Sequence, residues 1–387
     1  MLRLEIPFDK ISSLSDLLAL LRVSQIPEQM YSLYAERYLS WKSWEKGIPY
    51  RGTFELTPLC NLDCRMCYVH LKKKQLHGAP LLAVSEWQSL MRQAVESGMG
   101  KAILTGGECL TYPRFKELYL FLQSHGVAVS VYTNGTLLDD LWIRFFLQHP
   151  PEVIQISIYG SDEFGYEHVT GHRVQQLVMQ HLQTASDAGL PVRAAVTPSS
   201  FMGEDAKKII RSLSEQKIPF QINNTLFEPQ SNTGRQGKVK DLLPEQYIEL
   251  FKLEAELSGV QLISKPEETL PPLPVSDHKI VRGLRCAAGR NSFEITWQGK
   301  MQGCSSLDML PAEPLKTGFA KAWKNLHAQA LNYPVPAQCG QCVYHESCVS
   351  CPAQHQQLGA SIGQCSPSVC NRTKCYTSEG LIPFPNC

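Results

Sequence analysis

The stretch TFELTPLCNLDCRMC, residues 53–67, joins a run of apolar and β-branched residues to three closely spaced cysteines. Cys60, Cys64 and Cys67 are separated by three and then two residues. Three thiolates so close in sequence suit one metal centre better than disulfides, but a closed zinc or iron–sulfur site takes a fourth ligand from the protein. The sequence therefore predicts a metal centre with one position left open for chemistry.

The bulk composition is that of an ordinary globular protein. The chain has 387 residues, of which 43% are hydrophobic and 9% aromatic, and this is enough for two or three packed domains. The 37 basic and 36 acidic residues nearly cancel, so no overall field attracts nucleic acid or anionic lipid. We interpret the basic run Lys72–Lys74 as a solvated surface. We expect no nucleic-acid partner.

Targeting signals are missing from the sequence. The N-terminus has no uninterrupted apolar segment of the kind found in signal peptides, and no apolar run is long enough to span a membrane. We therefore expect no membrane association and a cytoplasmic location. In a reducing compartment, the 14 cysteines indicate metal ligands rather than disulfides.

Strand and helix patterns alternate from Thr53 onward. Short apolar or β-branched runs, typical of strands buried on both faces of a parallel sheet, occur at 53–59, 101–105, 127–133, 153–159, 191–197 and 218–224. Helical patterns lie between them, at 85–97, 113–124, 137–148, 173–188 and 204–216. Six consecutive β–α units predict an α/β fold, a partial (β/α)6 TIM-like barrel. The cysteines clustered after it predict a small cysteine-rich, metal-binding domain.

Four segments are expected along the chain: an N-terminal helical segment (1–50), the barrel (51–230), a helix near 244–258 with a Pro-rich linker at 265–274 (231–285), and the cysteine-rich domain (286–387). The first segment carries no motif for chemistry. It is either a flap packed on the barrel or a docking surface for a partner or peptide. Within the barrel, Ser85–Gln88 predicts a capping box at a helix start, and Gly98 a C-cap.

Polar motifs follow the predicted strands at their C-terminal ends, where barrels of this kind place their sites. Gly106, Gly107 and Glu108 follow the second strand, Asn134 ends the third and Ser157 lies at the end of the fourth. Taken singly, each is an ordinary turn or strand residue. Together at one edge of one barrel, they indicate a functional site.

These features resemble the radical S-adenosylmethionine (SAM) enzymes, through the CxxxCxxC loop after the first strand and the Gly-Gly-Glu after the second. The resemblance implies that Cys60, Cys64 and Cys67 bind a 4Fe-4S cluster, and that SAM chelates its fourth iron. It also implies that Gly106, Gly107 and Glu108 receive the SAM ammonium, and that Asn134 and Ser157 contact its carboxylate or ribose end. Met66 stands where the family usually has an aromatic residue, with Tyr68 following. A polarizable Met can still cover a purine.

A second group of cysteines follows the linker: Cys286, Cys304, Cys339-x2-Cys342-x5-Cys348-x2-Cys351, and Cys370. Their order resembles the SPASM extension of radical SAM enzymes. In that extension the fifth and sixth cysteines are usually separated by three residues, whereas two residues separate Cys348 and Cys351 here. The resemblance implies an outer auxiliary 4Fe-4S cluster on Cys339, Cys342, Cys348 and Cys370, and an inner one on Cys286, Cys304 and Cys351. A single structural zinc on Cys339, Cys342, Cys348 and Cys351 is the alternative.

The inner auxiliary cluster would then have three protein thiolates. Its fourth iron would be open to substrate or solvent, or filled by a distant residue. Cys365 and Cys375 flank Cys370 and are possible substitutes as ligands. Cys109 is either a thiol facing the substrate or a buried small hydrophobe, and Cys387 ends the chain.

The resemblance implies reductive cleavage of SAM to a 5′-deoxyadenosyl radical and hydrogen abstraction from an unactivated carbon. Ser157–Gly160 and Val169–Gly171 are most similar to maturases of ribosomally synthesised peptides. We therefore expect a peptide-modifying oxidoreductase that forms a thioether or another crosslink; no catalytic residue is assigned. Its expected partners are a ribosomal precursor peptide and an electron donor such as ferredoxin or flavodoxin. Many such maturases bind the leader with a winged-helix domain larger than the first segment here, so leader recognition is expected from a separate protein or the N-terminal helices, or is absent.

Three other functions stay open. One is the formylglycine chemistry of sulfatase maturases, although Tyr159 stands where those enzymes tend to have Asp. Another is a small-molecule radical SAM dehydrogenase or an enzyme of cofactor biosynthesis. A non-catalytic iron–sulfur carrier or zinc scaffold is the third, and the open three-cysteine site argues against it.

Overall fold

A computed structural model of the chain describes residues 6, 8–223, 242–259, 283–307, 309–336, 339, 342, 344, 348, 351–379 and 381. The Pro-rich segment 265–274 and Cys387 lie outside these residues. In the described part of the chain, no helix is both long and apolar enough to cross a bilayer.

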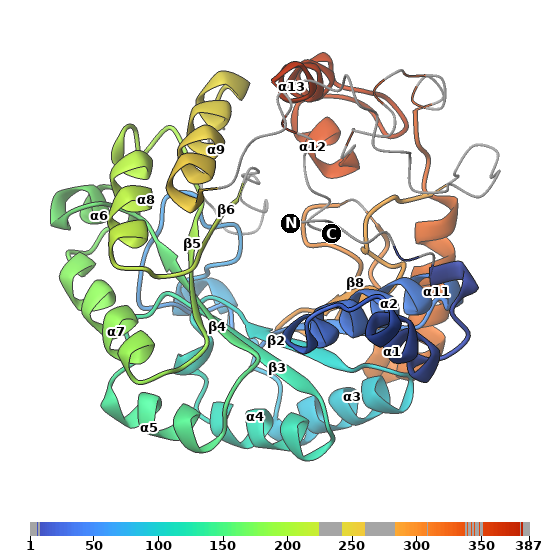
Figure 1. Cartoon of the computed structure of the whole chain (residues 1–387). Coiled ribbons are helices and arrows are strands. Elements are labelled where there is room, and N and C mark those ends of the chain that lie inside the picture. Colours follow the sequence, from blue (N-terminus) through green and yellow to red (C-terminus); the bar gives the residue numbers. More distant parts are fainter. Residues whose placement is uncertain are drawn as a thin grey trace.

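One curved parallel sheet organises the structure (Figure 1). Its first six strands lie side by side in sequence order, each parallel to the next: β1 (Arg51–Glu55), β2 (Lys101–Thr105), β3 (Ala128–Thr133), β4 (Val153–Ile158), β5 (Val192–Val196) and β6 (Phe220–Ile222). All six lie within the predicted strand ranges, apart from the first two residues of β1. The predicted α/β fold, a partial TIM-like barrel, is confirmed.

The sheet continues beyond β1 with strands from the C-terminal part of the chain. β7 (Ser292–Ile295) pairs parallel with β1, so that Thr53 lies opposite Glu294, and β8 (Met301–Gln302) pairs antiparallel with β7. The cysteine-rich region therefore begins on the same sheet as the barrel. This pairing was not predicted from the sequence, because it joins segments about 240 residues apart.

Helices cover the outer face of the sheet (Figure 1). They are α3 (Val84–Glu96), α4 (Phe115–Ser124), α5 (Asp140–Gln148), α6 (Glu163–Thr170), α7 (Gln175–Asp187) and α8 (Asp205–Glu215). The short α6 was not predicted. The capping box at Ser85 was wrong by two residues, because the backbone N–H of Ala83 donates to Oε2 of Glu86 at 2.7 Å and Ser85 already lies in the first turn.

Aromatic side chains fill the space between the sheet and these helices. The ring of Phe54 in β1 lies 5.9 Å from that of Phe293 in β7 and 6.1 Å from that of Trp87 in α3. All three side chains are buried. Because side chains alternate along a strand, the neighbours of Phe54 and Phe293 face the interior of the barrel instead. This alternation determines which polar groups reach the site.

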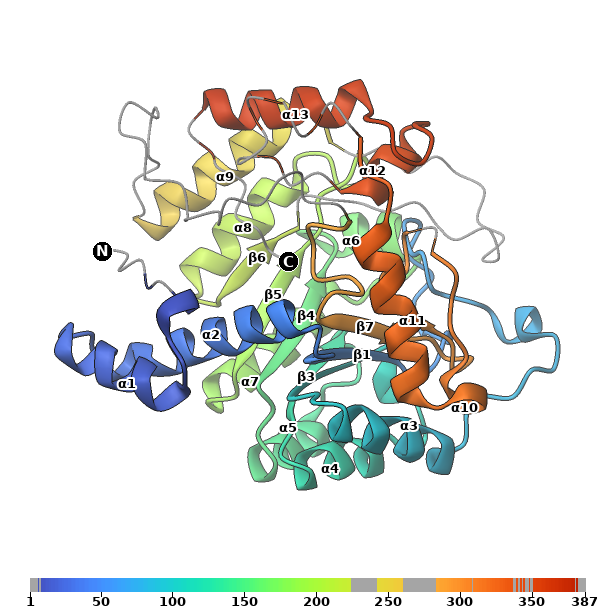
Figure 2. The same ribbon diagram turned by 90° about the vertical axis from the view of Figure 1, so that its right-hand side faces the viewer.

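The remaining helices lie beside the barrel and above its open side (Figure 2). They are α1 (Leu14–Val23), α2 (Tyr31–Lys46), α9 (Pro244–Ser258), α10 (Pro314–Thr317), α11 (Phe319–Asn332), α12 (Pro352–Gln357) and α13 (Pro367–Ser378). The 3-10 helices are η1 (Phe8–Lys10), η2 (Glu28–Met30), η3 (Lys73–Leu76) and η4 (Cys109–Thr111).

The N-terminal helices are attached to the base of the sheet by polar contacts. Lys101, the first residue of β2, forms ion pairs with Glu36 of α2 and with Glu152. The side-chain amide of Asn291 donates to the Ser40 carbonyl and to the Ser43 hydroxyl of α2, both at 3.0 Å. The helices predicted in this segment are therefore packed on the barrel.

Candidate functional site

The loop after β1 is held by the loop after β2. The backbone N–H of Gly107 donates to the Thr57 carbonyl at 2.7 Å, and that of Glu108 to the Leu59 carbonyl at 2.9 Å. A Cβ on Gly106 would lie 2.3 Å from the Thr57 oxygen, and one on Gly107 would lie 2.3 Å from the Leu59 oxygen. The glycine pair is therefore required for the close approach that positions the chain just before Cys60.

Glu108 joins the ends of β2 and β3. Its side chain is fully buried and accepts hydrogen bonds from the Leu110 backbone at 3.0 Å, the Thr133 hydroxyl at 2.8 Å and the Asn134 backbone at 2.8 Å. Burial raises the pKa of this carboxyl, and the three donors oppose the rise. The position of Glu108 at the strand ends agrees with the predicted site, and its contact with the SAM ammonium stays a prediction.

Asn134 connects the end of β3 to the cysteine loop. Its Nδ2 donates to Oδ1 of Asn61 at 2.9 Å and lies 3.6 Å from Sγ of Cys60. Asn61 in turn donates to the hydroxyl of Thr136 at 2.7 Å. Sequence reasoning missed Asn61 and Thr136. Two signals were available in the sequence. Asn61 directly follows the first cysteine, and Thr136 directly follows the predicted Asn134-Gly135 turn.

The three cysteines lie on one loop whose backbone points donors at sulfur. Sγ of Cys60 accepts from the Leu62 N–H at 3.4 Å, and Sγ of Cys67 accepts from the His70 N–H at 3.2 Å. Such bonds stabilise thiolate and cluster sulfur, so the donor set fits an iron–sulfur cluster. Burial raises the pKa of Cys60 to about 12, which a bound metal would overcome, because metal binding displaces the proton.

In the described residues, no three Cys, His, Asp or Glu side chains already converge on a point that could hold a metal ion. The ligand roles of Cys60, Cys64 and Cys67 therefore stay predictions. The loop that carries them is supported from α6, since the backbone N–H groups of Asp63 and Arg65 donate to the carbonyls of Thr170 and Val169, both at 2.9 Å.

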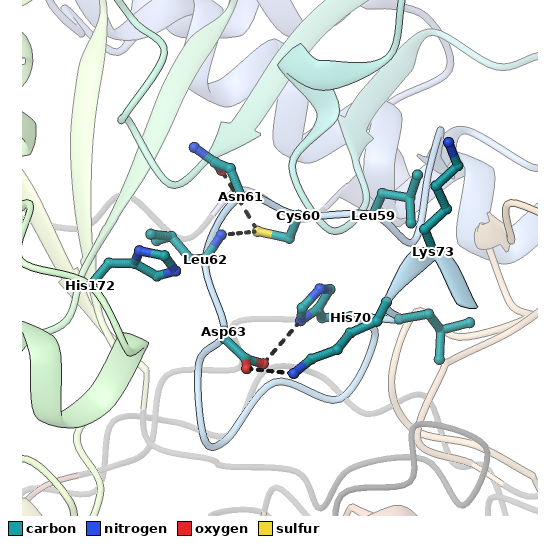
Figure 3. Close-up of a pocket in the computed structure, with 10 residues that line it drawn as sticks. Leu59, Cys60, Asn61, Leu62, Asp63, His70, Lys73 and His172 are labelled. Atoms are coloured by element: carbon teal, nitrogen blue, oxygen red, sulfur yellow. Dashed lines mark hydrogen bonds and ion pairs between the residues drawn. The ribbon is translucent and has the colours of Figure 1, made fainter. Parts of the chain in front are cut away.

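A pocket of about 460 Å³ opens beside this loop (Figure 3). Cys60 lines it together with His70, Lys73 and His172. Asp63 lies at its edge and pairs with Lys72 at 3.1 Å and with His70 at 3.5 Å. A cavity of this size suits a ligand the size of a small nucleoside.

Ser157 lies on β4, and its side chain is hydrogen-bonded to Tyr159, whose pKa burial raises well above the ordinary value. Met66 is buried, whereas Tyr68 keeps 37% of its surface exposed. These residues surround the cysteine loop, as Tyr159 is an electrostatic neighbour of both Cys64 and Cys67. Contacts of Ser157 with SAM stay a prediction.

The C-terminal cysteines separate into the two predicted groups. Cys304, which follows β8, is an electrostatic neighbour of Cys286 and Cys351. Cys348 has Cys339, Cys342 and Cys370 as its thiol neighbours. The ligand roles in the two auxiliary clusters, and the alternative of a single zinc, are not decided by this grouping.

Three further cysteines have distinct surroundings. Sγ of Cys365 lies 3.1 Å from Sγ of Cys339 and is also adjacent to Cys370, so it is a fifth thiol in the outer group. Cys109 is fully buried and its thiol donates to the Tyr132 carbonyl at 3.3 Å, which favours the small buried hydrophobe over a substrate-facing thiol. Cys375 packs with the apolar cluster around Tyr376 and Tyr247.

Comparison with known proteins agrees with this geometry. Residues 54–215 match the Radical SAM superfamily. Among curated proteins, the chain is 26% identical over 216 residues to the sporulation killing factor maturation protein SkfB of Bacillus subtilis, covering 55% of this chain and 51% of SkfB. It is 22% identical over 325 residues to the AdoMet-dependent heme synthase of Methanosarcina barkeri, covering 78% of this chain and 90% of that protein. The chain therefore spans about half of the length of SkfB.

The fold is also found in solved structures. SuiB of Streptococcus suis bound to S-adenosylmethionine superposes with a TM-score of 0.66 at 14% identity, over 93% of this chain and 88% of SuiB. SuiB bound to its precursor peptide SuiA gives a TM-score of 0.62 at 13% identity, over 91% and 86%. At these identities the likeness establishes the fold alone. The family match, the fold and the cysteine loop lead to one conclusion: this chain contains a radical SAM domain over residues 54–215.

Proposed function

We propose that the protein is a radical SAM oxidoreductase that modifies a peptide, forming a thioether or another crosslink. The observation that carries this proposal is the open three-cysteine loop held by Gly107 and Glu108, with two further groups of neighbouring thiols in the C-terminal part of the chain. The peptide substrate is supported by the relatives, since SkfB is a maturation protein and SuiB was solved with a precursor peptide.

We propose three 4Fe-4S clusters and SAM as cofactors. Cys60, Cys64 and Cys67 would hold the cluster that binds SAM. The inner auxiliary cluster would use Cys286, Cys304 and Cys351, and the outer one Cys339, Cys342, Cys348 and Cys370. Gly106, Gly107, Glu108, Asn134 and Ser157 are proposed as SAM contacts, because they lie at the strand ends around the cysteine loop.

When SAM is bound and its cluster is reduced, it supplies a 5′-deoxyadenosyl radical that abstracts hydrogen from the substrate. The protein's own residues position the cysteine loop and exclude water from the site. The Glu108–Asn134–Asn61 contacts fix the loop that carries Cys60, and the partly buried Tyr159 and the buried Met66 pack around it. A rigid site without water keeps the radical close to the carbon from which it takes hydrogen.

A one-electron donor such as ferredoxin or flavodoxin is required for this chemistry, and we place the protein in the cytoplasm, where such donors and reduced thiols occur. The precursor peptide would be recognised through a separate leader-binding protein or through α1 and α2. If α1 and α2 bind the peptide, they do so beside the base of the barrel, because α2 packs there on Lys101 and Asn291.

A small-molecule substrate is the second candidate. The haem synthase aligns over 90% of its own length, whereas SkfB aligns over 51%, and this higher coverage favours a small-molecule substrate. Formylglycine formation remains a third possibility.

The experiment combines two measurements. Anaerobic reconstitution should give about 12 irons per chain, and SAM with a strong reductant should yield 5′-deoxyadenosine. Replacing Cys60, Cys64 and Cys67 together by Ala should abolish that product, and persistence of deoxyadenosine would overturn the radical SAM assignment. Co-expression with short cysteine-containing peptides encoded beside the gene, followed by mass spectrometry, tests the substrate. A loss of two mass units supports crosslinking, whereas loss of sulfur with gain of an aldehyde supports formylglycine formation.

A further inference from the structure

A basic segment directly follows the cysteine loop. Between Asp63 and Glu86 the sequence contains Arg65 and the run Lys72–Lys74, and it contains no carboxylate. The formal charge of the whole chain is only +1 at pH 7, so positive charge is concentrated in this segment. A local concentration of charge attracts partners of the opposite sign even when the protein as a whole is nearly neutral.

The three lysines, which we call the lysine patch, are all exposed. Nζ of Lys72 lies 3.1 Å from Oδ2 of Asp63 in the cysteine loop. Lys73 and Lys74 begin the short helix η3, which lies at the edge of the molecule (Figure 2, light blue), and neither pairs with a carboxylate of the described residues. Lys72 therefore attaches the segment to the loop, while the charges of Lys73 and Lys74 are available to a partner.

Short contacts connect the lysine patch to the predicted cluster ligands. The backbone N–H of Leu71 donates to the Pro58 carbonyl at 2.9 Å, which holds the segment against the chain just before Cys60. The backbone N–H of His70 donates to Sγ of Cys67 at 3.2 Å. The patch thus begins two residues after a group that is bonded to cysteine sulfur. Electron transfer between proteins requires that the two redox groups come close, and a partner docked on the patch meets this requirement.

The surface beside the lysine patch is open as far as the first cysteine. The pocket of about 460 Å³ is lined by Cys60 together with Lys72 and Lys73. Figure 3 shows Lys73 and His172 on opposite sides of this pocket. Cys60 and Cys67 are both partly exposed. The patch therefore lies at the rim of an opening that leads to the sulfur atoms.

We propose that the lysine patch is the docking surface for a small acidic electron-carrier protein, which reduces the cluster proposed on Cys60, Cys64 and Cys67. This rests on the proposed function, which requires a one-electron donor. In the docked pair, one electron leaves the carrier, which is oxidised, and enters the cluster, which is reduced. No bond is formed or broken and no proton moves in this step. The oxidised carrier then dissociates.

The composition of the segment suits a transient partner. From residue 69 to residue 83, no large hydrophobic side chain is exposed, so the surface offers charge and little apolar area. Lysine is a strongly hydrated point charge on a flexible stem, and attraction between unlike charges raises association rates without a large interface. Redox partners typically bury less than about 1,200 Å² and separate readily. A carrier that must leave after each electron needs an interface of this kind.

The first test measures binding and needs no turnover. The reconstituted enzyme is titrated with a fluorescently labelled, oxidised flavodoxin, which serves as the acidic carrier. The double variant Lys73→Glu, Lys74→Glu should raise the Kd about tenfold or more at low ionic strength. The difference should disappear at about 0.5 M salt, because salt screens exposed charges. The neutralising variant Lys73→Gln, Lys74→Gln should give a smaller loss in the same direction.

The matched control reverses two charges elsewhere. Arg211 of α8 and Lys217 just after it are exposed, and α8 lies on the other side of the molecule from η3 (Figure 2). The double variant Arg211→Glu, Lys217→Glu changes the net charge by the same amount and should bind flavodoxin like wild type. Equal Kd values for the Lys73→Glu, Lys74→Glu variant and wild type, or equal losses in this variant and the control, would overturn the proposal.

The second test compares two electron sources. For each protein, the rate of deoxyadenosine formation with reduced flavodoxin is divided by the rate with dithionite, a small reductant that needs no docking surface. This ratio should fall about tenfold in the Lys73→Glu, Lys74→Glu variant and stay unchanged in the control. If wild type makes no deoxyadenosine with dithionite, the proposed function fails, and the binding measurement still decides whether the patch binds the carrier.

Two results of the second test would overturn the docking role while the proposed function stands. One is deoxyadenosine formation with equal ratios in wild type and in the Lys73→Glu, Lys74→Glu variant. The other is a variant that keeps this ratio but no longer modifies the precursor peptide, which would assign the lysines to the substrate instead of the carrier.

Discussion

The backbone N–H of Asn134 donates to Oε2 of Glu108 at 2.8 Å, so a carboxylate from the end of β2 holds the end of β3. The same carboxylate binds the Thr133 hydroxyl and the Leu110 N–H, and all of these groups are buried. The strand ends that carry the predicted SAM contacts are thus joined through one side chain.

Removing that side chain should destabilise the fold. Glu108→Ala leaves three buried donors without a partner, and we expect a loss of roughly 3 kcal/mol in the free energy of unfolding. The shift in urea midpoint measures it. Glu117→Ala is the control, since Glu117 pairs at the surface with Arg114. Equal midpoints for the two variants would contradict the joining role of Glu108.

The glycine pair makes a separate prediction about the cluster. In Gly107→Ala, the new methyl group would collide with the Leu59 carbonyl and displace the chain before Cys60. We expect a loss of about four irons per chain and of deoxyadenosine formation. Gly189→Ala, where the added methyl group meets open space at φ +84°, controls for backbone strain. Retention of full iron content by Gly107→Ala would show that the loop tolerates the displacement.

The fifth thiol of the outer group predicts redundancy. Because Cys365 lies 3.1 Å from Cys339 and next to Cys370, it should replace Cys370 as a ligand when the latter is removed. Cys370→Ser alone should keep most of the iron, and the double Cys365→Ser, Cys370→Ser variant should lose about four irons per chain. Cys375→Ser should change nothing, since Cys375 packs with Tyr376. Loss of four irons in Cys365→Ser alone would instead make Cys365 the resident ligand.

The buried Glu55 predicts how stability depends on pH. Its pKa is about 8 in the folded chain and near 4.3 in an unfolded one, so the folded state binds more protons between these values. Its contribution to stability is complete below about pH 4 and is lost as the pH rises through 8. Glu55→Gln should therefore gain about 2–3 kcal/mol relative to wild type between pH 6 and 9. Thermal unfolding of both proteins at pH 6 and at pH 9 measures this difference. If the stability of Glu55→Gln and of wild type changed equally between the two pH values, Glu55 would not carry a proton in the folded chain.

Local patterns predicted most of the fold. The strands were found because each is a short apolar run between turn residues, and α4, α5, α7 and α8 because their apolar faces repeat with helical spacing. The eight-residue α6 was missed because Gly165 weakens its pattern, although Asp162 caps it by accepting from the Gly165 N–H at 2.8 Å. β7 has only four residues, and nothing local indicates that it pairs with β1.

Part of the site was also predictable from local sequence patterns. The cysteine spacing and Gly106–Glu108 are contiguous motifs, so they stand out in the sequence. Asn61 and Thr136 instead meet through packing of two loops that are 75 residues apart in sequence.

The pairing of β7 with β1 also bears on how the protein can be divided. A chain ending before Ser292 would leave β1 as a bare edge, because the backbone groups of Arg51–Phe54 that now pair with β7 would be open to other molecules. It would also uncover the rings of Phe54 and Trp87, which now pack beneath Phe293 and its neighbours. The radical SAM portion should therefore aggregate when it is produced alone, and the smallest unit that stays in solution should extend through β8.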